Sequence, residues 1–277
     1  MHRALCIHPT DQLLDTLHKH HKLPGLEILT CAGGVEAVRL LRQRAVDVVL
    51  TDPATPVAED LALAREIRAI RPGVRLIVLA PATSPEDVIE ALKTSVFACF
   101  SSPIDLAEVA EMVAAAIADD HWTDGIEVVS GLPHWVTLRV SCRLLTAERL
   151  VRFMTEYQSD VPGGDRDLLM TAFREMLINA MEHGAAFNPE KVVEVTAAHT
   201  ARAIVYHFRD PGSGFDREDL AHAAKTSLAD DVLASAIRRA EEGRRPGGFG
   251  MLLVKQIVDE LVYNERGNEV IMIKHTA

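Results

Sequence analysis

The sequence has no hydrophobic run that approaches the ~18 residues needed to cross a membrane, and no signal peptide opens it. Cysteine is also scarce. The four residues Cys6, Cys31, Cys99 and Cys142 are scattered, with no Cys-x-x-Cys spacing. This pattern argues against a disulfide framework or a cysteine-based zinc site, and it is typical of thiols in a reducing compartment. We therefore expect a cytoplasmic protein with no membrane segment.

An excess of positive charge is missing too, because the formal net charge is −11 at pH 7. Proteins that bind nucleic acids without sequence preference are usually basic. We therefore expect no direct contact with nucleic acid. The sequence shows no low-complexity tract and no fixed-period repeat. Its 277 residues suit two domains of ordinary size, and 48% hydrophobic residues allow each domain a normal core.

Residues 1–118 alternate short apolar runs with amphipathic helical patterns. The apolar runs lie at 4–7, 26–29, 46–51, 76–80 and 96–100, and the helical patterns lie near 10–21, 34–44, 58–70, 84–94 and 105–118. Strands without polar alternation predict an α/β domain, with a five-stranded parallel sheet covered by helices on both faces. Ligand chemistry in such a fold belongs at the carboxyl ends of the strands.

This order resembles the receiver domain of two-component response regulators, which has a flavodoxin-like fold. Residues 46–53, with Pro56 close behind, look like the phosphoacceptor strand and its loop, which puts Asp52 at the phosphoacceptor position. Residues 101–104 match the loop that normally carries Lys-Pro. The resemblance covers nearly the whole N-terminal half.

The groups that a receiver uses for phosphotransfer are replaced. His8 and Pro9 stand where the resemblance implies an acidic pair for Mg²⁺, Ala80 where it implies a hydroxyl, and Ser102 where it implies a lysine. A phosphoryl acceptor without metal ligands or a cationic partner loses most of its transition-state stabilisation. We predict that Asp52 is not phosphorylated, and that this pseudo-receiver is an interaction or dimerisation module, with a homodimer as one expected assembly.

Residues 119–125 are polar and predict a linker, and residues 126–277 predict an α+β sandwich with a mostly antiparallel sheet and helices on one face. The expected elements are strands at 126–130 and 134–140 around a Gly131-Leu132-Pro133 turn, a helix capped by Thr146 that ends near Tyr157, a helix at 165–183, a strand pair at 192–197 with 202–208, a strand pair at 262–264 with 269–274 around a Gly267-Asn268 turn, and a helix from Met251 to Leu261.

The helix at 165–183 carries the first candidate site. Its apolar residues repeat with the helical period, whereas Glu175 and Asn179 stand one turn apart on the other face. A carboxamide oxygen suits a divalent cation, and a carboxylate beside it can accept a proton. We expect Asp165 to cap this helix and Gly184 to stop it. His183 either polarises a phosphate oxygen or only complements the dipole at the helix end.

Two glycine-containing stretches complete the pattern. Asp210-Pro211-Gly212-Ser213-Gly214 follows a strand, so Asp210 can accept a hydrogen bond from an exocyclic amine such as that of adenine, while Gly212 and Gly214 allow a tight turn. Residues 243–250 form a glycine-rich loop that opens a helix. Backbone N–H groups in such a loop cradle phosphate, which points to Gly247, Gly248 and Gly250.

In this order the three stretches resemble the N, G1 and G2 boxes of the GHKL (Bergerat-fold) ATPases, over about residues 130–277. The stretches 179–184 and 248–263 are most similar to the anti-sigma-factor serine kinases. The resemblance implies ATP and Mg²⁺ as cofactors, with Glu175 as the general base, Asn179 on the metal and Asp210 on adenine. It also implies an ATP lid at 216–246, from which Arg244 or Arg245 reaches the phosphates.

We therefore predict Mg·ATP-dependent phosphorylation of a serine on a partner. The resemblance suggests a small anti-anti-sigma (STAS) domain as the partner, with a sigma factor as a second client. One alternative is a non-catalytic, nucleotide-gated binding protein. A histidine kinase is disfavoured, because only His121 and His134 are available as phosphoacceptors, in a linker and a predicted strand.

Overall fold

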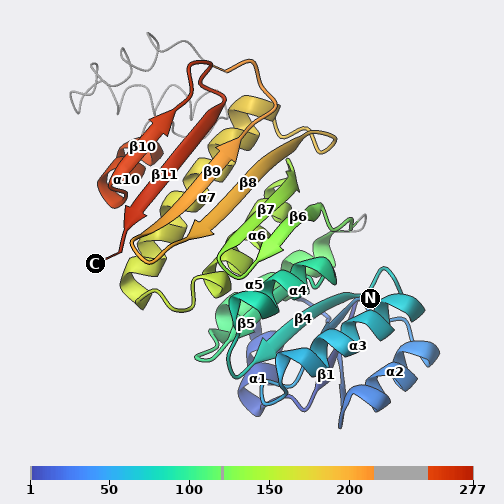
Figure 1. Ribbon diagram of the computed structural model, residues 1–277. Coiled ribbons are helices and arrows are strands. Elements are labelled where there is room, and N and C mark those ends of the chain that lie inside the picture. Colours follow the sequence, from blue (N-terminus) through green and yellow to red (C-terminus); the bar gives the residue numbers. More distant parts are fainter. Residues whose placement is uncertain (1, 120–121, 215–248, 277) are drawn as a thin grey trace. The chain divides into compact units, whose positions relative to one another are not determined.

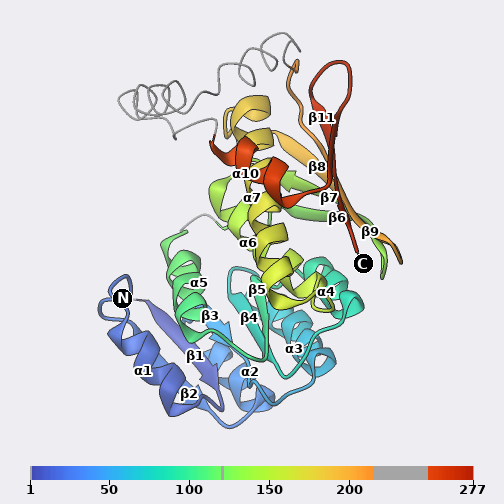
Figure 2. The same cartoon turned by 90° about the vertical axis from the view of Figure 1, so that its left-hand side faces the viewer.

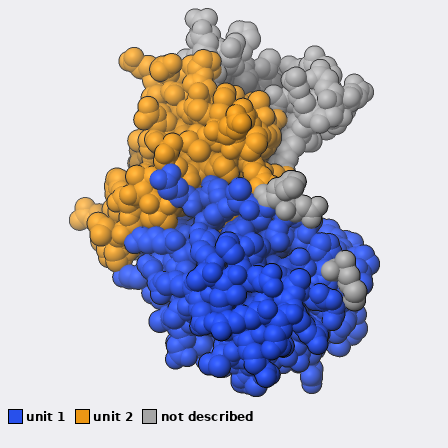
Figure 3. All heavy atoms as spheres, turned by 90° about the vertical axis from the view of Figure 1, so that its right-hand side faces the viewer, with its two compact units in different colours: residues 1–127, 152–160 blue, residues 128–151, 161–277 orange. Residues whose placement is uncertain are grey.

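The computed structural model describes residues 2–119, 122–214 and 249–276. The chain forms two compact units, which Figure 3 distinguishes by colour. The first unit comprises residues 1–127 and 152–160, and the second comprises residues 128–151 and 161–277. The domain limits expected from the sequence, at 118 and 126, stay predictions. Helix α6 (Leu144–Tyr157) contributes residues to both units.

The first unit contains a five-stranded sheet in the order β2-β1-β3-β4-β5, with every neighbouring pair parallel (Figure 1). Its strands are β1 (Arg3–Ile7), β2 (Glu27–Cys31), β3 (Val48–Leu50), β4 (Arg75–Ala80) and β5 (Ala98–Ser101), and its helices are α1 (Asp11–Lys19), α2 (Gly34–Gln43), α3 (Val57–Ile70), α4 (Pro85–Lys93) and α5 (Leu106–Ala118). The predicted fold class is confirmed.

Local sequence explains where these elements lie. All residues of β3 and β4 are buried, as expected for strands covered on both faces. Polar caps begin three of the helices. The side chain of Thr10 accepts the N–H of Leu13 at α1, and Ser84 forms a capping box with Asp87 at α4. Asp105 likewise caps α5.

Helix α3 contains a buried carboxylate, Asp60, which lies against Thr51, the residue that directly follows β3. The Thr51 hydroxyl donates to Asp60 Oδ2 at 2.8 Å, and only 3% of Asp60 is exposed. Burial raises the pKa of Asp60 to about 7, although the Thr51 hydrogen bond opposes the shift and the negative charges of Asp52 and Glu59 reinforce it. The folded state therefore prefers the protonated acid.

Asp60→Asn is expected to stabilise the protein more at pH 8 than at pH 4. Since the folded pKa lies above the unfolded value, the folded state holds the extra proton, and wild-type stability falls as the pH rises from about 4 through 7. Asn does not titrate, so its advantage should grow by roughly 2–4 kcal/mol across that window. Urea unfolding at the two pH values measures it, and an equal advantage at both would contradict the buried-acid account.

The second unit contains a six-stranded sheet in the order β10-β11-β9-β8-β7-β6. The pairs β10/β11, β11/β9, β9/β8 and β8/β7 are antiparallel. Figures 1 and 2 show α7 and α10 against one face of the sheet. The elements are β6 (Ile126–Leu132), β7 (Trp135–Ser141), α7 (Gly163–Ala185), β8 (Val192–His199), β9 (Ala203–Arg209), α10 (Phe249–Ile257), β10 (Glu260–Tyr263) and β11 (Glu269–His275). The predicted α+β architecture is confirmed.

The core of this unit lies between α7 and the sheet. Strand β9 alternates, so that Ile204, Tyr206 and Phe208 are buried on the helix side. Phe173 of α7 packs against both aromatic rings, with centroids 4.9 Å from Tyr206 and 5.2 Å from Phe208. This contact holds the opposite face of α7 away from the sheet.

The expected ends of α7 were wrong. The helix begins at Gly163 with Pro162 before it, so Asp165 lies in the first turn and is not the cap. It continues through Gly184 to Ala185, and Ala186 closes it in the left-handed conformation, with its N–H donating to the Glu182 carbonyl.

Three other boundaries differ from the predictions. Helix α6 begins at Leu144, so Thr146 lies inside its first turn and is not the cap. Strand β6 runs to Leu132, so the hairpin turn lies at residues 133–134 and not at 131–133. Helix α10 stops at Ile257, because the next residues join the sheet: Asp259 N donates to the Ile273 carbonyl, and Asp259 Oδ2 accepts the N–H of His275 at 2.6 Å. Within residues 2–119, 122–214 and 249–276, no helix is both long and apolar enough to cross a membrane.

Candidate functional site

Helix α7 presents Glu175 and Asn179 on its partly exposed side, one turn apart, while Phe173, Met176 and Leu177 are buried. The Glu175 side chain is 29% exposed. Helical spacing therefore puts a carboxylate and a carboxamide oxygen side by side where a ligand can reach them. The intermediate burial of both residues is consistent with the prediction that they share one face of the helix.

The start of α10 lies in close contact with the Glu175 carboxylate. A Cβ atom added to Gly250 would lie 2.3 Å from Glu175 Oε2, so only glycine leaves room for the carboxylate there. Helix α10 also packs along α7. Glu175 belongs to the first sequence motif and Gly250 to the third, 75 positions further along the chain. The two motifs thus meet at one carboxylate.

Asp210 lies just beyond β9 and is held by its backbone and side chain. Its N–H donates to the Asn268 carbonyl at 3.0 Å, and Asn268 Nδ2 donates to the Asp210 carbonyl at 3.4 Å. The N–H of Gly212 donates to Asp210 Oδ1 at 2.8 Å. Burial raises the pKa of the Asp210 carboxyl, against the opposing effects of the Gly212 N–H and the nearby His183.

Two glycines make space for this carboxylate. A Cβ on Gly184 would lie 2.3 Å from Asp210 Cγ, and a Cβ on Gly212 would lie 2.7 Å from Asp210 Oδ1 and 2.9 Å from the Gly184 Cα. The end of α7 and the loop after β9 therefore touch through glycine on both sides. Gly184 serves this close approach from within the helix, which continues to Ala185.

Gly214 joins the same loop to the β10–β11 turn. Its φ of +84° favours glycine, and a Cβ there would lie 1.7 Å from the Arg266 carbonyl oxygen. In that turn, Asn264 Oδ1 accepts the N–H groups of Asn268 and Glu269. Sequence reasoning placed a turn at Gly267-Asn268 but missed the role of Asn268 in fixing Asp210, because only the fold brings them together.

Arg174, which sequence reasoning also missed, flanks the Glu175 carboxylate. Its Nη1 lies 3.8 Å from Glu175 Oε1, and its Nε donates to Glu148 Oε2 of α6 at 3.3 Å. The hydrogen bond that Arg174 donates to Glu148 is the main reason that the pKa of Arg174 is raised. Arg174 thus places a permanent positive charge beside Glu175.

The residues present suit ATP and Mg²⁺. A Cβ at Gly250 would collide with the Glu175 carboxylate, and a Cβ at Gly184 or Gly212 would collide with the Asp210 carboxylate, so glycine at these positions lets both carboxylates keep their places. Across residues 2–119, 122–214 and 249–276, no three His, Cys, Asp or Glu side chains gather to hold a metal alone. That agrees with Mg²⁺ held by few protein ligands plus phosphate oxygens, a role that fits Asn179. The predicted Arg244, Arg245, Gly247 and Gly248 lie outside the described residues.

The first unit has its own candidate site, at the point where the strand order reverses between β1 and β3. His8 follows β1 with a φ of +41°, and its Nδ1 lies 3.1 Å from Asp52 Oδ2. Asp52 Oδ1 accepts the N–H of Ala54 at 2.9 Å. A histidine ring therefore occupies the side of Asp52 where the receiver resemblance implies metal-binding acids.

Comparison with known proteins assigns a family description to each part of the chain. Residues 5–114 match the response regulator receiver domain, and residues 141–274 match the histidine kinase-like ATPase domain. The chain joins a receiver domain to a histidine kinase-like ATPase domain. The second match implies ATP binding.

Curated relatives match only in part. Transcriptional regulatory protein GlrR of Escherichia coli is 28% identical over 143 residues, which is 50% of this chain and 29% of that protein. Transcriptional regulatory protein PrrA of Mycobacterium tuberculosis is 26% identical over 115 residues, which is 42% of this chain and 49% of that protein. The matches thus span less than half the length of these relatives.

Solved receiver structures resemble less than half of the chain. A receiver domain protein from Clostridium thermocellum is 24% identical, with a TM-score of 0.36, and the match covers 42% of this chain and 94% of that one. Chemotaxis response regulator CheY4 of Vibrio cholerae is 20% identical, with a TM-score of 0.35, and the match covers 42% of this chain and 98% of that one.

In the receiver domain, Asp52 is expected to stay unphosphorylated when the protein is treated with acetyl phosphate and Mg²⁺. One Asp52 oxygen lies against His8, and the positions for acid, hydroxyl and lysine hold His8, Ala80 and Ser102. Intact-mass spectrometry measures the label, with Asp52→Asn as the matched control. A stoichiometric acyl phosphate that disappears in Asp52→Asn would show that the domain is an active receiver.

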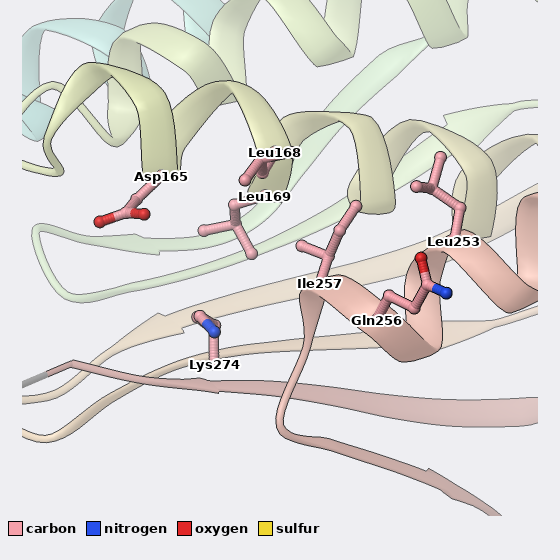
Figure 4. A pocket seen from close by; sticks show the side chains of 7 residues that line it. All are labelled: Asp165, Leu168, Leu169, Leu253, Gln256, Ile257 and Lys274. Atoms are coloured by element: carbon pink, nitrogen blue, oxygen red, sulfur yellow. The ribbon is translucent and has the colours of Figure 1, made fainter.

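The ATPase domain also contains a groove between the start of α7, α10 and β11 (Figure 4), with a volume of about 310 Å³. Leu168, Leu253 and Ile257 line it, with Asp165 and Lys274 among its polar residues. Glu175, Asn179 and Asp210 do not line this groove, so it is separate from the site assembled from the three sequence motifs.

Proposed function

We propose that this protein is an ATP-binding signalling regulator that acts as an anti-sigma-factor-type serine kinase. Its substrate would be a serine of a STAS-domain anti-anti-sigma partner, with a sigma factor as a second client. The observation that carries the proposal is the close approach of the three motifs in one domain, with Gly250 against Glu175, and with Gly184 and Gly212 around Asp210. Such contacts require glycine at these places for a structural reason.

Each residue then has a distinct task. Asp210 would accept a hydrogen bond from the exocyclic amine of adenine, and Asn179 would hold Mg²⁺, which would supply positive charge against the phosphates. Gly247, Gly248 and Gly250 would bind the phosphates through backbone N–H groups, and Arg245 would add positive charge. Glu175 takes the proton from the serine hydroxyl as the serine oxygen bonds to the γ-phosphorus and ADP leaves.

The partner follows from sequence resemblance. The stretches 179–184 and 248–263 are most similar to the anti-sigma-factor serine kinases. The curated relatives are named transcriptional regulatory proteins, which is consistent with a chain that acts on transcription through a sigma-factor pathway. The acidic net charge of −11 favours a protein partner over direct nucleic-acid contact.

Isothermal titration calorimetry is expected to show Mg·ATP binding to the full chain, and Mg·ATP is expected to raise the melting temperature through linkage. Asn179→Ala should weaken the dependence of ATP affinity on Mg²⁺, because it removes the protein ligand of the metal. Asp210→Asn should weaken the preference for ATP over GTP. If the folded wild-type protein binds neither ATP nor ADP, the proposed function is wrong.

A further inference from the structure

The second half of α6 lies in the same compact unit as the receiver sheet. Residues 152–160 belong to the first unit, whereas the first half of the same helix belongs to the second. A helix shared in this way is a physical connection, because its two halves move together unless hydrogen bonds between successive turns break. What holds residues 152–160 to the receiver domain therefore matters for the whole chain.

Glu156 is the centre of this contact, and only 3% of it is exposed. Ser101, at the end of β5, donates its N–H to Glu156 Oε1 at 3.2 Å and its hydroxyl to Oε2 at 2.5 Å. Thr83, in the loop after β4, donates its hydroxyl to Oε2 at 2.8 Å. A carboxylate buried to this degree is costly unless hydrogen bonds and charge compensate it, and here the receiver domain supplies three donors.

Arg152, one turn earlier on α6, supplies the compensating charge. It forms an ion pair with Glu156 and donates to Glu108 Oε2 of α5 at 2.9 Å. Its guanidinium carbon also lies 4.8 Å from the centroid of the Phe100 ring. The spacing of four puts Arg152 and Glu156 on one face of the helix, and that face meets β5 and α5.

Ser159 extends the same contact beyond the helix end, since its hydroxyl donates to the Thr83 carbonyl at 3.3 Å. None of these contacts involves His8 or Asp52. The surface that holds residues 152–160 is therefore complete in a receiver domain whose phosphoacceptor position is already paired with a histidine.

We propose that the receiver domain holds α6 of the same chain through the hydrogen bonds of Thr83 and Ser101 to Glu156. We call this contact the clamp, and we propose that it sets the conformation of α7. Residues 158–162 connect the end of α6 to Gly163, where α7 begins. Release of the clamp therefore loosens the start of the helix that carries Glu175 and Asn179. The effect on nucleotide binding rests on the proposed function of α7, whereas the clamp itself does not.

Hydrogen–deuterium exchange of the full chain tests the clamp with Glu156→Gln, which keeps the size but removes the charge. We expect amides in 152–160 to exchange on the order of tenfold faster, since a lost charge-assisted hydrogen bond destabilises local structure by about that factor. Amides at the start of α7, in 163–175, should also exchange faster. Glu66→Gln is the matched control, because Glu66 is exposed on α3; it should change neither segment.

Ser101→Ala approaches the same contact from the receiver side, and it keeps the test valid if Glu156→Gln folds poorly. The double variant should show less than the sum of the two single effects, because both changes remove one shared interaction. Unchanged exchange in 152–160 would overturn the clamp. Faster exchange there with unchanged exchange in 163–175 would overturn its control of α7.

Nucleotide binding provides a separate arm of the same experiment. If wild type binds Mg·ATP, Glu156→Gln should change the Kd by at least about threefold, as expected for a weak coupling between sites. An unchanged Kd would overturn the coupling to the nucleotide site. If wild type binds no nucleotide, the proposed function fails, while exchange in 152–160 and 163–175 still decides whether the clamp exists.

Discussion

Glu175→Gln is expected to lower phosphotransfer from ATP to the STAS partner by ~10²–10⁴-fold, the usual loss for a general base. Gln keeps the size of the side chain and one oxygen acceptor, but it cannot take the proton from the serine hydroxyl. Because the proton moves only on the way to the transition state, the loss should fall on kcat, and the Kd for Mg·ATP should stay within about threefold. Single-turnover transfer of radiolabelled phosphate and calorimetry measure the two quantities.

Glu190→Gln is a suitable control, since Glu190 is exposed beyond the end of α7 and the change removes the same charge. Two results would contradict the assigned role. Loss of ATP binding in Glu175→Gln would place this carboxylate in the nucleotide or metal cradle. Absence of phosphotransfer in wild type and variant alike, with partner affinity that depends on ATP, would identify a nucleotide-gated binding protein.

Gly184→Ala is expected to weaken ATP binding by roughly ten- to hundredfold, the value of one hydrogen bond to a charged group. The new methyl group would lie 2.3 Å from Asp210 Cγ and Oδ1. The Asp210 backbone is held by Asn268 on both its N–H and its carbonyl, so the carboxylate has to leave the place from which it would contact adenine. Calorimetric titration with Mg·ATP and Mg·GTP measures the loss of affinity and of base preference.

Gly163→Ala is the matched control for this change, because it lies on the same helix and a Cβ there meets no atom within 4 Å. It should leave ATP affinity unchanged. Wild-type affinity and base preference in a well-folded Gly184→Ala protein would show that Asp210 does not read the base. A shared loss in both variants would instead point to a general effect on α7.

Much of the architecture could be predicted because it depends on local patterns. Uninterrupted apolar runs identified the parallel strands, and alternation identified strands such as β9. Glu175 and Asn179 could be placed on one helix face from their spacing alone. The presence of His8 after the first strand could be read from the sequence, although its 3.1 Å contact with Asp52 could not.

The remaining features depend on contacts between segments far apart in the chain. Gly184 looked like a helix stop, but its role is to admit Asp210, which comes from another element. Asn268 looked like an ordinary turn residue, although it fixes Asp210 through the backbone. Residues after Ile257 continue a helical pattern in sequence, yet the hydrogen bonds of Asp259 with β11 draw them into the sheet. Local propensity is overridden where such partners exist.

The burial of Glu156 has a consequence for modularity. A fragment cut at residue 126, which keeps the whole ATPase domain, would carry Glu156 and Arg152 without Thr83, Ser101, Glu108 and Phe100. A fragment that ends at residue 118 would expose Thr83, Ser101, Glu108 and Phe100 to water. Recombination of this receiver with a different ATPase domain would meet the same mismatch. The receiver domain is therefore expected to be needed for the burial of Glu156.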